Sequence, residues 1–379
     1  MHSNLQTSRK LLVVSDTVIL ENAEGKKGYE PVVRELDIIA DLFEEIIWLG
    51  YGFSQTQTPV TSPVSSNIRL VAMPRSGGSG LFSKMRVIFR YPIYLFYILK
   101  YLPGVTHVHS RAPSHPALLA MLISKWDKGR KYWHKYAGNW IEPNPPNSYA
   151  RQRNILSSIN NSNVFGTVNG YWPGQKKHLL PFENPCLYES ERSRAEGYSK
   201  NKDFTGKLSI IFVGSLSAFK GVIELVKAME HLTYPRKFSE LIIVGNGVLW
   251  DELIILAEEK SKINIRLVGS LNRLQVEELY NNAHIIVLPS LSEGFPKVIG
   301  EGAAYGCIPV VTNISSLDQY IRHGENGYLL ENNRPETIAR AINEISVSPI
   351  LKRISMNATM LTSKFTYEYY KKRIVNEIL

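Results

Sequence analysis

Short apolar runs rich in β-branched residues alternate with longer stretches of helical periodicity along most of the chain. In the first half this alternation predicts helices at 31–43, 113–126 and 149–159. Strands are predicted between and around them, at 11–15, 46–49, 68–73, 106–110, 131–134 and 164–168. A polar stretch, 189–206, then interrupts the pattern.

The same alternation restarts after this stretch. It predicts strands at 208–213, 241–244, 265–268, 285–288 and 309–311, with helices at 221–229, 250–259, 275–281, 297–305 and 335–345. Alternating strands and helices at this spacing indicate an α/β protein with two doubly wound parallel sheets. We expect two Rossmann-like domains that face each other across a cleft, with ligands at the carboxyl ends of the strands.

Length and composition agree with this interpretation. A chain of 379 residues is long enough for two domains, and 44% apolar with 21% charged residues is typical of folded proteins. Two cysteines, Cys186 and Cys307, cannot form a disulfide framework and indicate a reducing compartment. The start of the chain is polar and no apolar run approaches about 20 residues, so we expect a cytoplasmic protein.

The net charge of +10 is concentrated in one region. Residues 46–182 contain 16 basic side chains and only two acidic ones, whereas residues 183–379 are neutral overall. Such a field attracts phosphates, anionic lipid or nucleic acid, although a basic surface without any partner is an equally good interpretation.

Segment 81–102 carries part of this charge. On a helix Arg86, Arg90 and Lys100 fall on one side, with aromatic and aliphatic residues elsewhere, and Pro92 predicts a break into two short helices. This pattern suits a helix that lies in a lipid interface, and it predicts peripheral attachment to the inner face of the plasma membrane. The alternative is a core helix whose cations extend to solvent.

The stretch VLPSLSEGFPKVIGEGAAYGCIPVV combines a buried strand, a loop and a helix. Gly294 allows close backbone approach to a ligand, and Pro296 suits the first turn of the helix, whose free N–H groups can bind phosphate or sugar oxygens. Glu301 follows Glu293 by two helical turns, so both carboxylates are predicted to face one ligand.

This Glu-x7-Glu arrangement resembles the retaining glycosyltransferases of family four, which have the GT-B fold. FVGSLSAFKG, LIIVGNGVLWDEL, NIRLVGSLNRLQVEELYNNAHIIVLPS and RHGENGYLL extend the resemblance over residues 208–331. It implies an acceptor-binding domain at 1–188, a nucleotide-sugar domain at 207–362 and a final helix at 363–379 that crosses back to the first domain.

The resemblance also implies roles for single residues. Glu293 would hold hydroxyls of the transferred sugar, Glu301 the donor ribose, and Lys220 would neutralise the diphosphate. Asn246 and Gly247 would border the base, and Gly214 would allow close approach of its loop. The implied donor-binding set is Gly214, Ser215, Lys220, Asn246, Gly247, Glu293, Gly294, Phe295, Pro296, Lys297, Val298 and Glu301.

The chain departs from the family pattern at two places. Ser215 stands where most relatives have arginine, and Lys297 is a partial substitute for the missing cation. Relatives often have a Gly-Gly pair and a glutamate where this chain reads Ser315-Ser316-Leu317-Asp318-Gln319.

The first half offers weaker signals. Lys26, Lys27 and Gly28 are predicted to meet an acceptor phosphate, with a solvated loop as the equal alternative. By resemblance His134 would approach the donor sugar as a catalytic residue, and His109 and Arg111 would line the acceptor side. A histidine at a strand end is otherwise more often structural.

The resemblance thus implies a retaining, hexosyltransferase-type enzyme that moves a sugar from a nucleotide-diphosphate donor to a glycan or lipid-linked glycan in surface polysaccharide synthesis of the bacterial type. No cofactor or metal is expected, because Lys220 and helix N–H groups would replace Mg²⁺. The alternatives are a sugar phosphorylase or nucleotide-sugar epimerase with the same fold, and a basic nucleic-acid-binding module. The last has no use for the glutamate pair, so we expect no nucleic-acid partner.

Overall fold

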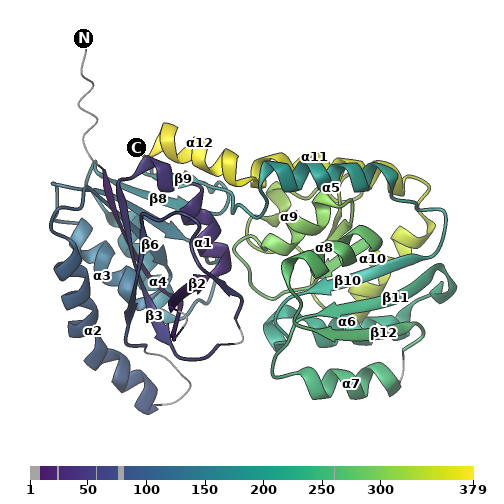
Figure 1. Cartoon of the computed structure of the whole chain (residues 1–379). Coiled ribbons are helices and arrows are strands. Elements are labelled where there is room, and N and C mark those ends of the chain that lie inside the picture. Colours follow the sequence, from purple (N-terminus) through teal and green to yellow (C-terminus); the bar gives the residue numbers. More distant parts are fainter. Residues whose placement is uncertain (1–8, 24, 57, 76–80, 260) are drawn as a thin grey trace, which may run out of the picture. The chain divides into compact units, whose positions relative to one another are not determined.

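The computed structural model describes residues 9–379 apart from 24, 57, 76–80 and 260, with the backbone alone for residues 81–88. Contacts divide the chain into two units, 1–182 with 371–379, and 183–370 (Figure 1). These boundaries differ from the expected ones, at which the first domain ends at residue 188 and the final helix begins at residue 363. The backbone N–H of Cys186 donates to the carbonyl oxygen of Phe365, which joins both segments to the second unit. Within the first unit, Arg373 lies over the ring of Phe182.

The first unit contains a sheet with a parallel core. β1, the longest strand, lies between β3 and β6, and the parallel order is β5-β3-β1-β6-β7-β8-β9. β2 pairs antiparallel with the last four residues of β1, and β4 pairs antiparallel with β2. The strands are β1 Lys10–Asn22, β2 Gly25–Tyr29, β3 Glu45–Phe53, β4 Val60–Thr61, β5 Ile68–Met73, β6 His107–Ala112, β7 Lys131–Tyr136, β8 Val164–Val168 and β9 Leu179–Pro181.

Helices cover both faces of this sheet. α3 (His115–Ser124) packs on β1 and β6 together with α2 (Leu81–Tyr101) and α4 (Asn147–Ser158). α1 (Glu30–Asp37) covers the opposite face and is followed by a short 3₁₀ turn at Ala40–Leu42, in place of the single helix expected over 31–43.

The break expected at Pro92 is not present in α2. The helix is continuous because Pro92 lies on its exposed side, where water can satisfy the carbonyl that loses an N–H partner. In the described part of the chain, no helix has both the length and the apolar character needed to cross a bilayer.

The second unit contains a six-stranded parallel sheet of order β12-β11-β10-β13-β14-β15. Its central strands are apolar on both faces, as Ile210, Ile211 and Phe212 illustrate, because helices cover both sides. The strands are β10 Leu208–Val213, β11 Phe238–Val244, β12 Asn264–Gly269, β13 Ile285–Leu288, β14 Ile308–Thr312 and β15 Tyr328–Leu330.

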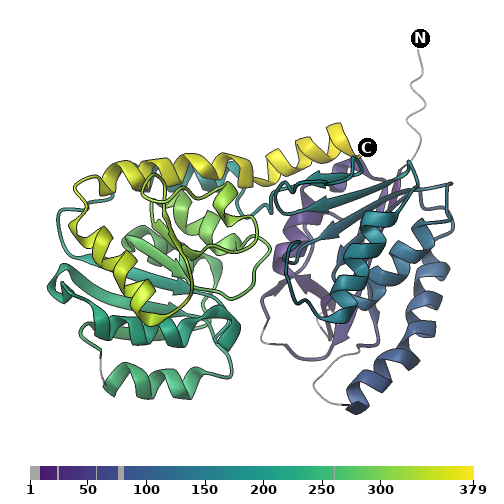
Figure 2. The ribbon, with the colours of Figure 1, turned by 180° about the vertical axis from the view of Figure 1, so that it is seen from behind.

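Two helical layers enclose this sheet (Figures 1 and 2). One layer contains α5 Glu189–Asn201, α8 Arg273–Asn282, α9 Lys297–Ala304 and α11 Leu351–Leu361, and the other contains α6 Val222–Ala228, α7 Trp250–Glu259 and α10 Pro335–Val347. α12 (Tyr367–Glu377) ends the chain. α5 forms in the polar stretch where the apolar pattern predicted no element. The pattern missed this helix because its buried residues, Ala195 and Ser199, are small.

Ser315 has unusual backbone geometry. It lies in the loop that follows β14, and its φ of 53° makes it the only non-glycine residue with positive φ in the described part of the chain. A Cβ in this left-handed region costs about 1–2 kcal/mol, so Ser315 stores strain.

Ser315→Gly should therefore stabilise the second unit by about 0.5–1 kcal/mol, since relief of strain outweighs the added flexibility of the unfolded chain. The midpoint of urea unfolding measures this change. Ser316→Gly is the matched control, because Ser316 has an ordinary φ of −90° and its replacement should destabilise. A lower midpoint for Ser315→Gly would contradict the assignment of strain.

Candidate functional site

Three loops meet backbone to backbone at the carboxyl edge of the second sheet. A Cβ at Gly245, whose φ is 138°, would overlap the carbonyl oxygen of Gly214, and a Cβ at Gly221 would overlap that of Pro289. The N–H of Leu291 donates to the carbonyl oxygen of Phe219 at 2.8 Å. These approaches fix the loops that follow β10, β11 and β13 against one another.

Lys220 and Glu293 face each other across two of these loops. The Lys220 Nζ forms an ion pair with Oε1 of Glu293, and the Ser290 hydroxyl donates to the same oxygen at 2.9 Å. Both charged side chains are only partly exposed. The pair offers a cation for phosphate oxygens and a carboxylate for hydroxyl groups, so it can bind both ends of a sugar diphosphate.

The loop before α9 is fixed by contacts of Phe295 with neighbouring residues. The Phe295 ring stacks on Phe365 with centroids 4.4 Å apart, and Asn184 Nδ2 donates to the Phe295 carbonyl oxygen at 3.2 Å. Pro296 is the N-cap, so the first N–H groups of α9 lack helical partners beside Gly294. Lys297 opens the helix, with its Nζ 5.8 Å from the centre of the Tyr367 ring.

Glu301 lies two turns into α9 and has a different set of neighbours from Glu293. Its Oε1 is 3.4 Å from Nη1 of Arg273, the first residue of α8. Burial alone would lower the pKa of Arg273, but Glu301 and the other carboxylates around it raise that pKa further than burial lowers it. The residue pattern alone did not single out Arg273, because its contact with Glu301 arises only when α8 packs on α9.

The remaining predicted donor residues lie on the same loops. Ser215, Asn246 and Gly247 are exposed, and the Leu216 N–H donates to the Asn246 carbonyl oxygen at 3.0 Å. The Asn246 side chain accepts from the Gly247 N–H at 2.8 Å. The structure thus places Ser215 and Asn246 on two loops that are joined directly by hydrogen bonds.

In the first unit, the predicted phosphate loop is corrected to a strand. Lys26, Lys27 and Gly28 belong to β2, which pairs with β1, and Lys26 forms an ion pair with Glu21 at 3.0 Å. Gly28 is required by packing, because a Cβ there would overlap the indole ring of Trp48. Glu24 lies outside the described residues.

The surroundings of His134 do not favour the catalytic role predicted for it. Its ring is fully buried between β7 and α3, and its nitrogens hydrogen bond with the hydroxyls of Ser110 (2.7 Å) and Ser124 (2.9 Å). Burial lowers the pKa of His134 to about 3, so the ring is neutral near pH 7. A sugar cannot reach this ring while the core of the unit is closed.

His109 and Arg111 lie on the other face of the same sheet. The His109 ring is buried and stacks on Trp133 with centroids 3.8 Å apart, which favours a structural role over contact with an acceptor. Arg111 Nη1 donates to Glu35 at 2.6 Å, and Lys135 donates to the same carboxylate at 2.9 Å. Arg111 therefore anchors α1 and keeps about 14% of its side chain exposed.

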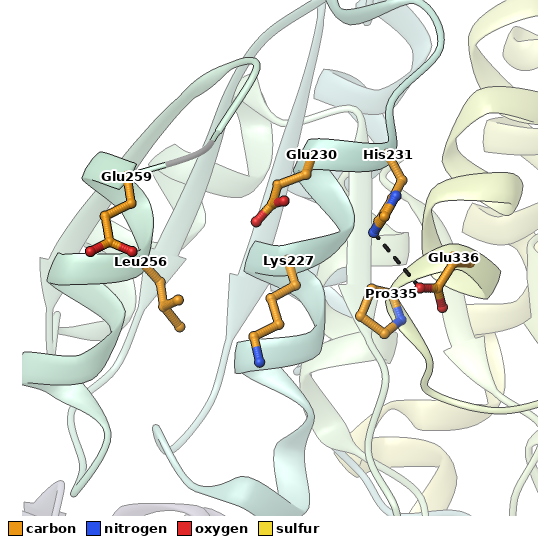
Figure 3. Close-up of a pocket in the computed structure, with 7 residues that line it drawn as sticks. All are labelled: Lys227, Glu230, His231, Leu256, Glu259, Pro335 and Glu336. Carbon is orange, nitrogen blue, oxygen red and sulfur yellow. Dashed lines mark ion pairs between the residues drawn. The ribbon is translucent and has the colours of Figure 1, made fainter.

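A separate hollow of about 290 Å³ lies between α6, α7 and α10 (Figure 3). Its charged residues include Glu230, Glu259 and Glu336, with His231 3.8 Å from Glu336. No predicted site residue lines it, and no metal-binding group occurs within the described residues.

Comparison with known proteins adds sequence and structural relatives. Residues 194–359 match the family model of the Glycosyl transferases group 1. An uncharacterized glycosyltransferase of Methanocaldococcus jannaschii is 31% identical over 137 residues, 36% of this chain and 35% of that protein. The UDP-Gal:alpha-D-GlcNAc-diphosphoundecaprenol alpha-1,3-galactosyltransferase of Escherichia coli is 27% identical over 119 residues, 31% of either chain.

These alignments span only about a third of the length of either relative. A solved structure extends the likeness to the whole chain at the level of fold. The structure of Anabaena HepE in complex with UDP and glucose aligns over 97% of this chain and 98% of that chain, with a TM-score of 0.65 and 14% identity. The two parallel-sheet units and this likeness show that the chain has the GT-B fold, and its residues 194–359 are similar to the Glycosyl transferases group 1.

Proposed function

We propose that the protein is a retaining glycosyltransferase that moves a sugar from a nucleoside diphosphate sugar to a hydroxyl of a glycan or lipid-linked glycan. The observation that carries this proposal is the pairing of Lys220 with Glu293 on loops locked together by glycine contacts. The solved relative bound to UDP and glucose supports a donor of this class.

The donor would exchange partners with this pair. Its diphosphate would take Lys220, and the released Glu293 would accept hydrogen bonds from hydroxyls of the sugar. N–H groups of residues 294–298 would meet the remaining oxygens, with Asn246 and Gly247 beside the base. Because both charges exchange one partner for another, neither is left buried and unpaired.

Catalysis would then depend on position and charge. The acceptor oxygen bonds to the anomeric carbon on the face from which the diphosphate departs, and the acceptor proton passes to the departing phosphate oxygen. Lys220 and the N-terminus of α9 stabilise the charge that develops on the diphosphate. These groups supply the positive charge for the step, so the proposal includes no metal ion or cofactor.

We place the acceptor on the first unit, with Arg111 as the candidate contact that retains exposure. The lipid-diphosphate acceptor in the name of the E. coli relative supports a lipid-linked glycan and a place in surface polysaccharide synthesis. Phosphate groups of such an acceptor would also suit the excess of basic residues in 46–182.

The outer face of α2 supports attachment to a membrane surface. Phe89, Phe96 and Leu99 are 72%, 60% and 50% exposed, and their spacing of seven and three residues puts them on one side of the helix. Arg90 and Lys100 flank this stripe, while Arg86 lies outside the residues with described side chains. Apolar side chains between cations fit an anionic leaflet such as the inner face of a plasma membrane.

The stereochemistry of the product tests the proposed reaction. An α-linked nucleoside diphosphate sugar should give an α-linked product, because attack and departure use the same face. NMR coupling constants of the purified product measure this outcome. A β-linked product would contradict retention, and release of sugar 1-phosphate that depends on inorganic phosphate would identify a phosphorylase.

The two glutamates should fail in different ways. Glu301→Ala should weaken binding of the free nucleotide about ten- to a hundredfold, the loss expected for a charged hydrogen bond. Glu293→Gln should leave nucleotide affinity nearly unchanged and lower kcat, since its proposed partner is the sugar. Calorimetry and initial rates measure the two effects, and the reverse pattern would exchange the two roles.

Phe96→Asp should release the protein from vesicles that contain anionic lipid, because it places a negative charge within the apolar stripe. Flotation at low salt measures attachment. Trp126→Asp is the matched control, since Trp126 is an 83% exposed aromatic residue that follows α3 rather than lying on α2. Equal loss in both variants, or no flotation of the unmodified protein, would contradict attachment through α2.

A further inference from the structure

Arg273 binds several partners in the second unit. Its Nε and Nη2 donate to the two carboxylate oxygens of Glu191, each at 3.1 Å, and Nη2 also donates to the Cys186 carbonyl oxygen at 3.2 Å. Glu277 lies 3.1 Å from Nε. The remaining nitrogen, Nη1, contacts Glu301 at 3.4 Å, so a guanidinium that is itself fixed by its other partners holds Glu301.

The partners that fix the Arg273 guanidinium are themselves held by backbone hydrogen bonds. Glu191 Oε2 accepts from the Tyr188 N–H at 2.7 Å, and the Cys186 N–H donates to the Phe365 carbonyl oxygen at 2.9 Å. The segments around residues 186 and 365 are therefore joined by a hydrogen bond next to the Cys186 carbonyl group that Arg273 contacts. The guanidinium is also planar and permanently charged, which suits it to fix a carboxylate in one orientation.

The contact with Glu301 leaves part of that carboxylate available. Arg273 engages Oε1, whereas Oε2 has no hydrogen-bond partner among the described residues, and the side chain is 19% exposed. A carboxylate held by one oxygen can present the other to a pair of adjacent hydroxyls. Ribose offers such a pair, and 2′-deoxyribose does not.

We propose that Arg273 is a positioning residue that holds Glu301 in the orientation needed to select ribonucleotides over 2′-deoxyribonucleotides. This inference rests on the proposed function, in which Glu301 binds the donor ribose. Arg273 acts through Glu301 and does not itself touch the nucleotide.

The decisive quantity is the ratio of affinities for ribo- and 2′-deoxyribonucleotides, measured by calorimetry with UDP, GDP and their 2′-deoxy forms. Arg273→Met should lower this ratio by about tenfold, because Glu301 then loses its fixed orientation. Arg194→Met is the matched control. Arg194 donates to Glu277 at 2.6 Å in the same network, has no recorded contact with Glu301 among the described residues, and its loss should leave the ratio unchanged.

A double variant separates positioning from general destabilisation. In a Glu301→Gln background, Arg273→Met should change the ratio no further, whereas a purely structural role would lower the unfolding temperature and leave the ratio intact. If Arg273→Met fails to fold, Glu191→Gln removes a carboxylate that fixes Arg273 and should lower the ratio by about threefold.

Two results would overturn the inference and are distinguishable. If Glu301→Gln lowers the ratio and the folded Arg273 and Glu191 variants do not, Arg273 has no positioning role and the proposed function stands. If Glu301→Gln itself leaves the ratio unchanged while the nucleotide still binds, the ribose assignment fails, and the inference fails with it.

Discussion

Close backbone approach at Gly245 and Gly221 is the constraint on which the candidate site depends. Any side chain at Gly245 would push the loop after β11 away from Gly214, and any side chain at Gly221 would push the loop after β10 away from Pro289. Lys220 reaches Glu293 only because these loops cannot separate. The site is therefore positioned by contacts between main chains, which side-chain substitutions elsewhere on the loops can leave intact.

The charged residues of the site pair with one another. Lys220 with Glu293, and Arg273 with Glu301, neutralise each other in partly buried surroundings, where an unpaired charge would be costly. The proposed donor, with two negative phosphates and several hydroxyls, can replace the partners of Lys220 and Glu293 while Arg273 keeps its contact with Glu301, so binding exchanges interactions without creating isolated charges. In the first unit a similar arrangement, Arg111 and Lys135 on Glu35, serves instead to attach α1 to the sheet.

The apolar pattern predicted the strand–helix alternation well, because parallel strands buried on both faces are continuous apolar runs that local sequence displays. It missed α5, whose buried residues are small, and it broke α2 at Pro92, whose cost depends on which side of the helix faces solvent. The roles of Glu293 and Lys220 stay predictions, and the structure shows that the two side chains meet on loops that have little freedom. The sequence pattern did not predict the burial of His134 or the strand pairing of Lys26, because the face of a strand and the pairing of a hairpin are set by distant residues such as Ser124 and Trp48.

Under the proposed function, the uneven charge would serve two different electrostatic tasks. In the second unit the cations act at contact distance on partly buried partners, where salt screens little, so a neutral unit suffices. The basic excess of residues 46–182 acts over distances comparable to the Debye length, about 10 Å at 0.1 M salt, and so its effect depends on the number of cations more than on their exact placement. The proposed attraction of the first unit to an anionic surface could therefore change by substitution of single exposed cations, while the geometry at Lys220 and Glu293 is preserved.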